Sequence, residues 1–263
     1  MKERGRKGRW ARRLSRIALV LSLGGVAVAA IAAVGTGTGL WSYGAGLGAL
    51  RYALPAAVAG GVLAIVAWIL GRRQGVRAGW LNALALVTAL LFAGYLGNMI
   101  VTARSLPAIH DVATNLDDLP QFSRLGVRAD NLEKIPDQGR AELKAMAAEE
   151  RWKALHRQAY GDLKPLRLAA PPDQVLQRVE QLARERGWAV AAVDPAAGTL
   201  EATATTLFFR FKDDVVVRVR PDPERPGGSV VDMRSISRVG VSDIGVNAKR
   251  VRHFLADLRE TAK

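Results

Sequence analysis

A run of polar side chains from Arg234 to Arg250 could carry chemistry, because it mixes arginine, serine, aspartate and asparagine at close spacing. Arg234 and Arg238 are four positions apart, so they lie on one face of an extended strand. The run leads into an expected helix, whose first backbone N–H groups favour an anion near Ser242 or Asp243. This pattern predicts a site for a carboxylate, a phosphate or a lipid headgroup. The candidate ligand-binding residues are Arg234, Ser235, Arg238, Asp243, Asn247 and Arg250, with Asp213 and Asp214 from an earlier acidic pair.

The same residues also suit a purely structural role. Asp213, Asp214 and Asp243 could neutralise the arginines by forming ion pairs with them. Asn247 could satisfy backbone groups, and the glycines of the run would allow a tight turn. The sequence leaves the binding role and the structural role both open.

A catalytic reading depends on His110, the one histidine with an acidic neighbour, Asp111. An imidazole oriented by a carboxylate could act as a base toward Ser235 or Ser237. Adjacent residues on an extended segment point to opposite sides, however, and no Gly-x-Ser-x-Gly motif accompanies either serine. A hydrolase that uses His110 and Asp111 with the 234–250 junction is therefore the alternative function.

Other chemistries lack their sequence signatures. The chain has no cysteine, and its three histidines, at 110, 156 and 253, show no metal-ligand spacing, so no metal site is predicted. Residues 44–49 match a dinucleotide fingerprint in letters alone, since no strand precedes them. We expect no cofactor.

The elements that position these residues begin with a membrane region. Three stretches, 17–34, 52–70 and 80–101, contain no charged residue and are long enough to cross a hydrocarbon core. They predict three transmembrane helices within residues 17–103, after a basic tail of residues 1–16. No charged residue lies inside them, which argues against a transporter.

Charge in the short loops predicts the orientation. Eight basic residues precede Ile17, and Arg72, Arg73 and Arg77 lie in the loop between the second and third spans. The loop between the first and second spans contains only Arg51. Because lysine and arginine are held on the cytoplasmic side, the N-terminus is expected inside, and three crossings deliver the rest of the chain to the outside. In a bacterium this describes a multi-pass protein of the inner membrane with a periplasmic or extracellular domain. Cleavage of the first segment as a signal peptide would leave that domain on the same side.

The remaining residues predict a compact α+β domain. Residues 104–170 suggest a tether with a helix at about 140–157, and residues 171–263 a folded domain. Asp173 could cap a helix that Gly187 ends, and the last helix is expected from about Ser242. Both helices would cover an antiparallel four-stranded sheet, giving two layers. The expected strands are 188–193, 199–206, 215–220 and 229–237.

Three motifs resemble the bacterial family called domain of unknown function 1499. They are the Arg234–Arg250 run, the Phe-Lys-Asp-Asp run around Phe211, and His110-Asp111 followed by Asp118, Pro120 and Phe122. The resemblance covers about residues 107–258 and leaves out the three spans. It implies a fold but no activity.

These observations predict a non-catalytic membrane protein whose outer domain binds another envelope component, either a protein or an anionic headgroup. The bilayer is its expected permanent partner. Nucleic acid is not expected, because the basic excess belongs to the membrane half: net +11 up to residue 101 and +3 after it.

Overall fold

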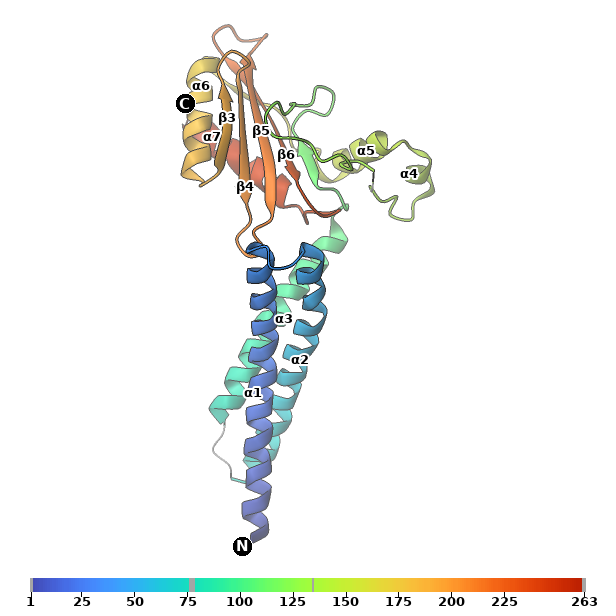
Figure 1. Ribbon diagram of the computed structural model, residues 1–263, viewed down its shortest axis with the longest axis vertical. Coiled ribbons are helices and arrows are strands. Elements are labelled where there is room, and N and C mark those ends of the chain that lie inside the picture. Colours follow the sequence, from blue (N-terminus) through green and yellow to red (C-terminus); the bar gives the residue numbers. More distant parts are fainter. Residues whose placement is uncertain (1, 76–78, 134, 262–263) are drawn as a thin grey trace. The chain divides into compact units, whose positions relative to one another are not determined.

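The computed structural model describes residues 2–75, 79–133 and 135–261, with side chains from residue 9 onward. The chain divides into two compact units. One contains the residues up to Val101 together with Leu207–Arg210, and the other contains Thr102–Thr206 with the residues from Phe211 onward. The first is built from long helices and the second from a sheet and its covering helices (Figure 1).

The first unit contains α1 (Lys2–Gly37), α2 (Tyr43–Arg73) and α3 (Gly79–Ser105). By length and composition, Arg9–Gly37, α2 and α3 are each long and apolar enough to cross a membrane. The three predicted spans lie inside these helices, so the prediction of three candidate spans is confirmed. The helices continue past the uncharged stretches, because nothing in the flanking sequence stops them before the left-handed glycines Gly39 and Gly75.

Small residues let α1, α2 and α3 approach closely. A Cβ at Gly60 of α2 would lie 2.6 Å from the backbone nitrogen of Ser22 and 2.7 Å from the carbonyl oxygen of Ala18, both in α1. A Cβ at Gly61 would lie 2.8 Å from the Cβ of Ala89 in α3. These contacts are those of membrane helices that pack through glycine and alanine rather than through large side chains.

The second unit contains the predicted antiparallel meander. Its strands are β3 (Ala189–Asp194), β4 (Thr199–Thr205), β5 (Lys212–Pro221) and β6 (Ser229–Ser237), and they pair in sequence order. β6 has the predicted bounds. β5 alternates as predicted, with Val215, Val217 and Val219 facing the core.

The sheet has six strands, and the prediction of four was too low. β1 (Asp111–Ala113) and β2 (Leu166–Leu168) both pair antiparallel with the outer edge of β6. β1 pairs with Arg234–Ile236 and β2 with Ser229–Val231, so the two short strands lie end to end. Three residues are too few to show an alternating pattern, and for that reason the sequence did not reveal them.

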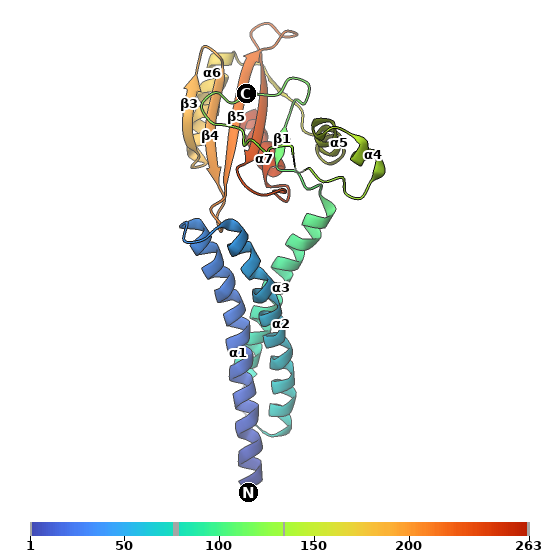
Figure 2. The same cartoon turned by 45° about the vertical axis from the view of Figure 1, so that its right-hand side comes forward.

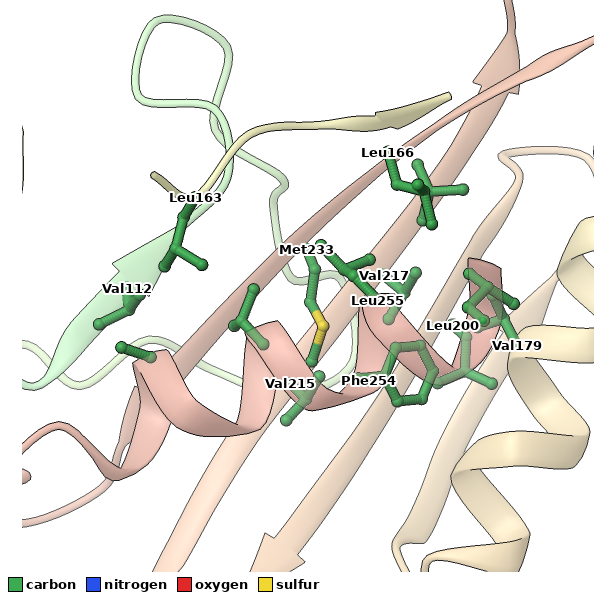
Figure 3. Packing of buried hydrophobic residues seen from close by; sticks show 14 of the residues in the cluster. Val112, Leu163, Leu166, Val179, Leu200, Val215, Val217, Met233, Phe254 and Leu255 are labelled. Atoms are coloured by element: carbon green, nitrogen blue, oxygen red, sulfur yellow. The ribbon is translucent and has the colours of Figure 1, made fainter. Parts of the chain in front are cut away.

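One layer of helices covers the sheet. α6 (Pro172–Glu185) and α7 (Val246–Thr261) pack on the same face (Figure 1). The buried side chains of this layer include Phe254 and Leu255 from α7, which pack against Met233, Val215 and Val217 of the sheet (Figure 3). This is the expected two-layer α+β arrangement.

Both helix starts differ from the prediction. The N-cap of α6 is Pro171 with no side-chain hydrogen bond, and Asp173 lies in the first turn rather than at the cap. α7 begins at Val246 instead of about Ser242, because Ile244 and Gly245 take left-handed backbone conformations, with φ of 53° and 77°, that a helix cannot include. Gly187, also left-handed, follows the end of α6 as predicted.

The helix predicted at 140–157 is two helices, α4 (Ala141–Ala145) and α5 (Ala148–Tyr160). Met146 and Ala147 between them are extended. The Arg151 side chain stabilises the break by donating to the carbonyl oxygens of Leu143 at 2.7 Å and Met146 at 3.1 Å. The guanidinium thus satisfies acceptors that a continuous helix would have used.

The segment 104–170, expected as a tether, belongs to the domain core. α5 lies beside β1 (Figure 2). Two of its side chains hydrogen-bond to the outer edge of this strand. Trp152 Nε1 donates to the Asp111 carbonyl oxygen at 2.9 Å, and His156 Nε2 accepts from the Ala113 backbone at 3.2 Å. Side chains therefore replace the missing neighbouring strand and close an edge that could otherwise pair with another chain.

His156 makes the stability of this edge sensitive to acid. Burial lowers the pKa of His156 from its ordinary 6.5 to about 4. Between these values the unfolded chain binds a proton that the folded chain resists, so stability is full above pH 6.5 and falls toward pH 4 by up to about 3 kcal/mol. We expect urea titration of the detergent-solubilised chain to show this loss. His156→Gln, which keeps an acceptor for Ala113, should remove most of it.

The matched control is His253→Gln, because His253 is exposed on α7. This variant should keep the pH dependence of the parent. An unchanged pH dependence in His156→Gln would contradict the assignment.

Candidate functional site

The predicted site residues are divided between the two faces of β6. Arg234 and Arg238 share one face, as alternation predicted, and Asp214 pairs in register with Ile236 on that same face. Ser235 lies on the opposite face, where its hydroxyl oxygen accepts from Arg250 Nη1 at 3.0 Å. The three arginines therefore do not form one pocket. The position of Arg250 relative to Arg234 and Arg238 depends on which face of β6 is covered by α7. The sequence did not reveal that face.

Arg234 forms a buried ion pair with Asp111 of β1. Its Nε and Nη2 donate to the two carboxylate oxygens at 3.0 and 2.7 Å. Asp111 also accepts from Asn131 Nδ2 at 2.6 Å, and the Asn131 amide oxygen faces His110 Nε2 at 3.1 Å. All four side chains are buried. This chain of contacts holds the first strand and the loop after it on β6.

Arg238 pairs with Asp214 at the end of the same face. Its Nε and Nη2 donate to the carboxylate at 2.7 and 2.8 Å, and Thr203 donates to Asp214 at 2.8 Å. The hydrogen bonds to Asp214 raise the pKa of Arg238. Unlike Arg234, Arg238 keeps 41% of its side chain exposed. Its pairing therefore leaves a charged edge accessible.

On the helix face, Asn247 and Arg250 join α7 to the sheet. Arg250 Nη2 donates to Asp213 at 2.6 Å. Asn247 accepts from Ser235 at 2.7 Å and donates to Ser237 Oγ at 2.9 Å. Asn247 Nδ2 also donates to the His110 carbonyl oxygen at 2.9 Å, so the polar groups of this cluster hold α7 on the sheet and on the segment that leads into β1.

Asp243 occupies the start of α7. Its two carboxylate oxygens accept from the backbone N–H groups of Gly245 at 2.9 Å and Asn247 at 2.7 Å. Burial raises the pKa of Asp243, and these two hydrogen bonds oppose that rise. The chain itself thus supplies a carboxylate to the helix N-terminus that was expected to favour an anion.

The His110 imidazole contacts neither serine hydroxyl. Its Nδ1 faces the Val241 carbonyl oxygen at 3.2 Å and its Nε2 faces Asn131. The hydroxyls of Ser235 and Ser237 instead contact Asn247. The Ser237 backbone N–H donates to the His110 carbonyl oxygen at 3.0 Å, but within the described residues the His110 imidazole forms no hydrogen bond with either serine hydroxyl. Asn131 stands between the imidazole and the Asp111 carboxylate.

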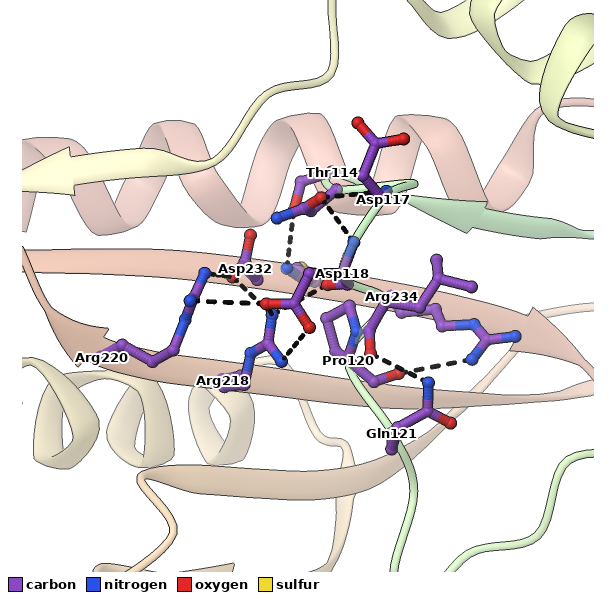
Figure 4. A network of polar contacts seen from close by, with 12 residues as sticks. Thr114, Asp117, Asp118, Pro120, Gln121, Arg218, Arg220, Asp232 and Arg234 are labelled. Carbon is purple, nitrogen blue, oxygen red and sulfur yellow. Dashed lines mark hydrogen bonds and ion pairs between the residues drawn. The ribbon is translucent and has the colours of Figure 1, made fainter.

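A second charged network lies on the face that α6 and α7 leave open (Figure 4). Arg218 donates to Asp118 at 2.8 Å and to the buried Asp232 at 3.0 Å, and Arg220 donates to Asp232 at 2.6 Å. These contacts fix the segment after β1 across the sheet. The sequence analysis did not identify this network, although the alternate spacing of Arg218 and Arg220 in a strand was a signal that they share a face.

Glu201 of β4 holds the same segment. Its buried carboxylate accepts from the backbone N–H groups of Ser123 at 2.7 Å, Arg124 at 3.0 Å and Leu125 at 2.7 Å. Burial alone would raise the pKa of Glu201, but the hydrogen bonds outweigh it and lower the pKa. A single glutamate in a strand gives no sequence signal for such a backbone cradle.

A hollow of about 320 Å³ opens beside Arg238. Arg128, which was not predicted from the sequence, also lines this hollow and donates to the Gly240 carbonyl oxygen at 2.7 Å. Arg128 is separated from the 234–250 run by a hundred residues, so spacing could not have linked them. We call this hollow the Arg238 cleft; its lining residues are Gly126, Arg128, Asp214, Ile236, Ser237 and Arg238.

Residues 111–258, more than half of the chain, match the family described as protein of unknown function (DUF1499). The chain belongs to this family. The match begins at Asp111, the partner of Arg234, and covers all six strands of the sheet, whereas α1, α2 and α3 lie outside it. The resemblance drawn from the motifs is thereby confirmed. A search of curated proteins finds no match.

Burial separates the roles of two otherwise similar arginines of this DUF1499 domain. Arg234→Leu would leave Asp111 buried and unpaired, and we expect a loss of about 3–5 kcal/mol in the free energy of unfolding. Arg238→Leu removes a side chain that is 41% exposed, and the buried Asp214 keeps its hydrogen bond from Thr203, so the loss should be smaller, about 1–3 kcal/mol. Urea titration of the detergent-solubilised chain, followed by circular dichroism, measures both. Equal losses would show that Arg238 is as structural as Arg234.

Proposed function

We propose that this protein is a non-catalytic binding module of the bacterial cell envelope. In this proposal the helices α1 to α3 anchor it in the inner membrane, and its DUF1499 domain binds an anionic group of another envelope component, a protein or a headgroup, at the Arg238 cleft.

The observation that carries the proposal is the exposure of Arg238. Of the eight residues predicted to bind a ligand, it is the one whose side chain remains exposed. A guanidinium that already holds Asp214 through one edge can present its outer edge to a second anion. Arg128, which also lines the cleft, adds a second guanidinium, 17% exposed, that is held in place by Asp130 at 2.6 Å.

Several features favour binding over catalysis. A hydrolytic base needs a nitrogen lone pair within reach of the nucleophile or of a water molecule, and the ring nitrogens of His110 face Val241 and Asn131. The serine hydroxyls of β6 hold Asn247. The alternative of an envelope hydrolase therefore has no contact in its favour among the described residues.

The proposed envelope location rests on the distribution of basic residues and on the odd number of membrane crossings. Eight basic residues precede the first uncharged stretch at Ile17, and Arg72, Arg73 and Arg77 lie between the second and third stretches, which favours a cytoplasmic position for both segments. Three crossings then carry the domain to the outer side. An arrangement of this kind would present the Arg238 cleft to periplasmic or extracellular partners.

A reporter fused after Lys263 tests the orientation. We expect alkaline phosphatase, which folds in oxidising compartments, to be active there, and green fluorescent protein to be dark when exported unfolded through the same route. A reporter pair placed at the loop after α2 should give the opposite result. Activity of the cytosolic reporter after Lys263 would place the domain inside and exclude an envelope partner.

Photo-crosslinking from the cleft tests the binding role. Gly126 lines the cleft, and a Cβ atom added there meets no atom within 4 Å, so a photoreactive amino acid is introduced at this position. In native membranes we expect a discrete adduct from position 126 that Arg238→Ala reduces severalfold, because the anion loses its guanidinium.

Two controls define this result. Arg184→Ala removes an exposed arginine on α6 that pairs with Glu180, and it should leave the adduct unchanged. A photoreactive residue at Ala196, in the exposed β3–β4 turn, should give no such adduct. An adduct from position 126 that persists in Arg238→Ala would contradict recognition through this arginine.

A further inference from the structure

The chain enters the domain at the same end of the sheet from which two loops leave. Asp111 of β1 and Asp214 of β5 both pair with Ile236 of β6, so the start of β1, the start of β5 and the end of β6 coincide. The β4–β5 loop (206–211) and the β6–α7 loop (238–245) therefore extend from the end at which the chain arrives from α3. We call this end of the sheet the entry end.

Exposed apolar side chains gather at the entry end. Leu207 and Phe208 in the β4–β5 loop are 79% and 61% exposed, and Val241 and Val246 lie exposed at the β6–α7 junction. Val127, also exposed, precedes the cleft residue Arg128. Among the residues described after Ser105, Met146 is the only other large hydrophobic side chain with comparable exposure. Such a concentration is unusual for a surface that faces water.

The loop that carries Leu207 and Phe208 is closed tightly. The Thr206 backbone N–H donates to the Phe211 carbonyl oxygen at 2.8 Å, and the Phe211 N–H donates to Thr206 Oγ1 at 2.8 Å. Arg210 inside the loop has a left-handed backbone, with φ of 56°. These bonds fix a short turn with its apolar residues at the tip, so exposing them is a property of the fold.

The exposed charges around these apolar residues are basic. Arg210 and Lys212 flank the tip, and Arg238 and Lys249 lie on or next to the other loop. The acidic residue of that loop, Asp243, is hydrogen-bonded to the start of α7. Apolar side chains ringed by lysine and arginine match an interface with anionic lipid headgroups.

The connection to the membrane region is short. Five residues separate Ser105 of α3 from Asp111 of β1. A fully extended chain of this length spans at most about 20 Å. Strands are about 4.8 Å apart, so the β4–β5 loop leaves the sheet only about 10–15 Å to the side of the point where this connection enters. The apolar tip therefore leaves the sheet close to the point at which the chain arrives from the candidate span α3.

We propose that the entry end of the sheet is a membrane-docking surface. Leu207 and Phe208 insert among the lipid headgroups, Val241 and Val246 contact the same interface, and Arg210 and Lys212 bind anionic headgroups. The domain is then fixed on the bilayer at two points, through the connection after α3 and through the β4–β5 loop.

Fluorescence quenching tests this docking in the full chain, which contains no cysteine. The chain is placed in nanodiscs of phosphatidylcholine with phosphatidylglycerol, and a single cysteine at Phe208 carries an environment-sensitive dye. We expect nitroxides attached near the lipid headgroups to quench this dye severalfold more than a dye at Ala196, which lies in the turn at the opposite end of the sheet. Aqueous iodide should show the reverse preference.

A dye at a second position controls for disruption of the β4–β5 loop by the dye at position 208. A dye at Val241→Cys, on the neighbouring loop, should also be quenched by the lipid nitroxides, and Leu207→Ser with Phe208→Ser should reduce that quenching. Arg210→Gln with Lys212→Gln should weaken it in nanodiscs that contain phosphatidylglycerol and not in pure phosphatidylcholine.

Two results would overturn the proposal. Dyes at positions 208 and 241 that iodide quenches as strongly as the dye at 196 would show that the entry end faces water. Dyes protected from both quenchers would show that it is covered by protein, either α1 to α3 or another chain.

Discussion

The buried pair between Asp111 and Arg234 is the interaction on which the domain depends. Removing two charges from water is costly, and the cost is recovered only when every polar atom finds a partner. Here the two-pronged hydrogen bonds of Arg234, the Asn131 amide and the contact of that amide with His110 meet this demand. The pair fastens the first strand to β6 although more than a hundred residues separate them, which makes the segment after α3 part of the fold and not a tether.

The position of β6 explains why its polar residues resemble a site in the sequence. β6 is buried along its whole length, with α7 on one face and the segment after β1 on the other. A charged side chain in such a strand must be paired within the domain, so Arg234 with Asp111 and Asp232 with Arg218 and Arg220 are requirements of burial. Arg238, the first residue after β6, escapes this requirement in part because the covering layers end there. The remaining accessible charge is therefore found where the strand leaves the core.

Local patterns predicted those features that depend on neighbouring residues. Uncharged stretches of bilayer length predicted α1 to α3, alternating valines predicted β5, and β6 was predicted with its observed bounds. Features that depend on distant partners were not predictable. The strands β1 and β2 exist because the edge of β6 receives them, α4 and α5 separate because Arg151 takes up the carbonyl oxygens between them, and Arg250 lies on the face opposite Arg234 because α7 packs there. Strand alternation predicted that Arg234 and Arg238 lie on the same face of β6. No local pattern predicted which face α7 covers.

The helices and the segment after β1 cover most of the sheet, so few surfaces of this domain remain open to a partner. One face of the sheet is covered by α6 and α7, and part of the other by the segment after β1, which Arg218 and Glu201 hold. The β1 edge is closed by Trp152 and His156 of α5. The Arg238 cleft and the apolar loops, where we propose that recognition takes place, share the entry end, because both begin where β5 starts and β6 stops. A domain that rests on lipid by this end would open its cleft close to the headgroups. Ligands that belong to the membrane, or are held at its surface, would then reach Arg238 more readily than freely diffusing ones.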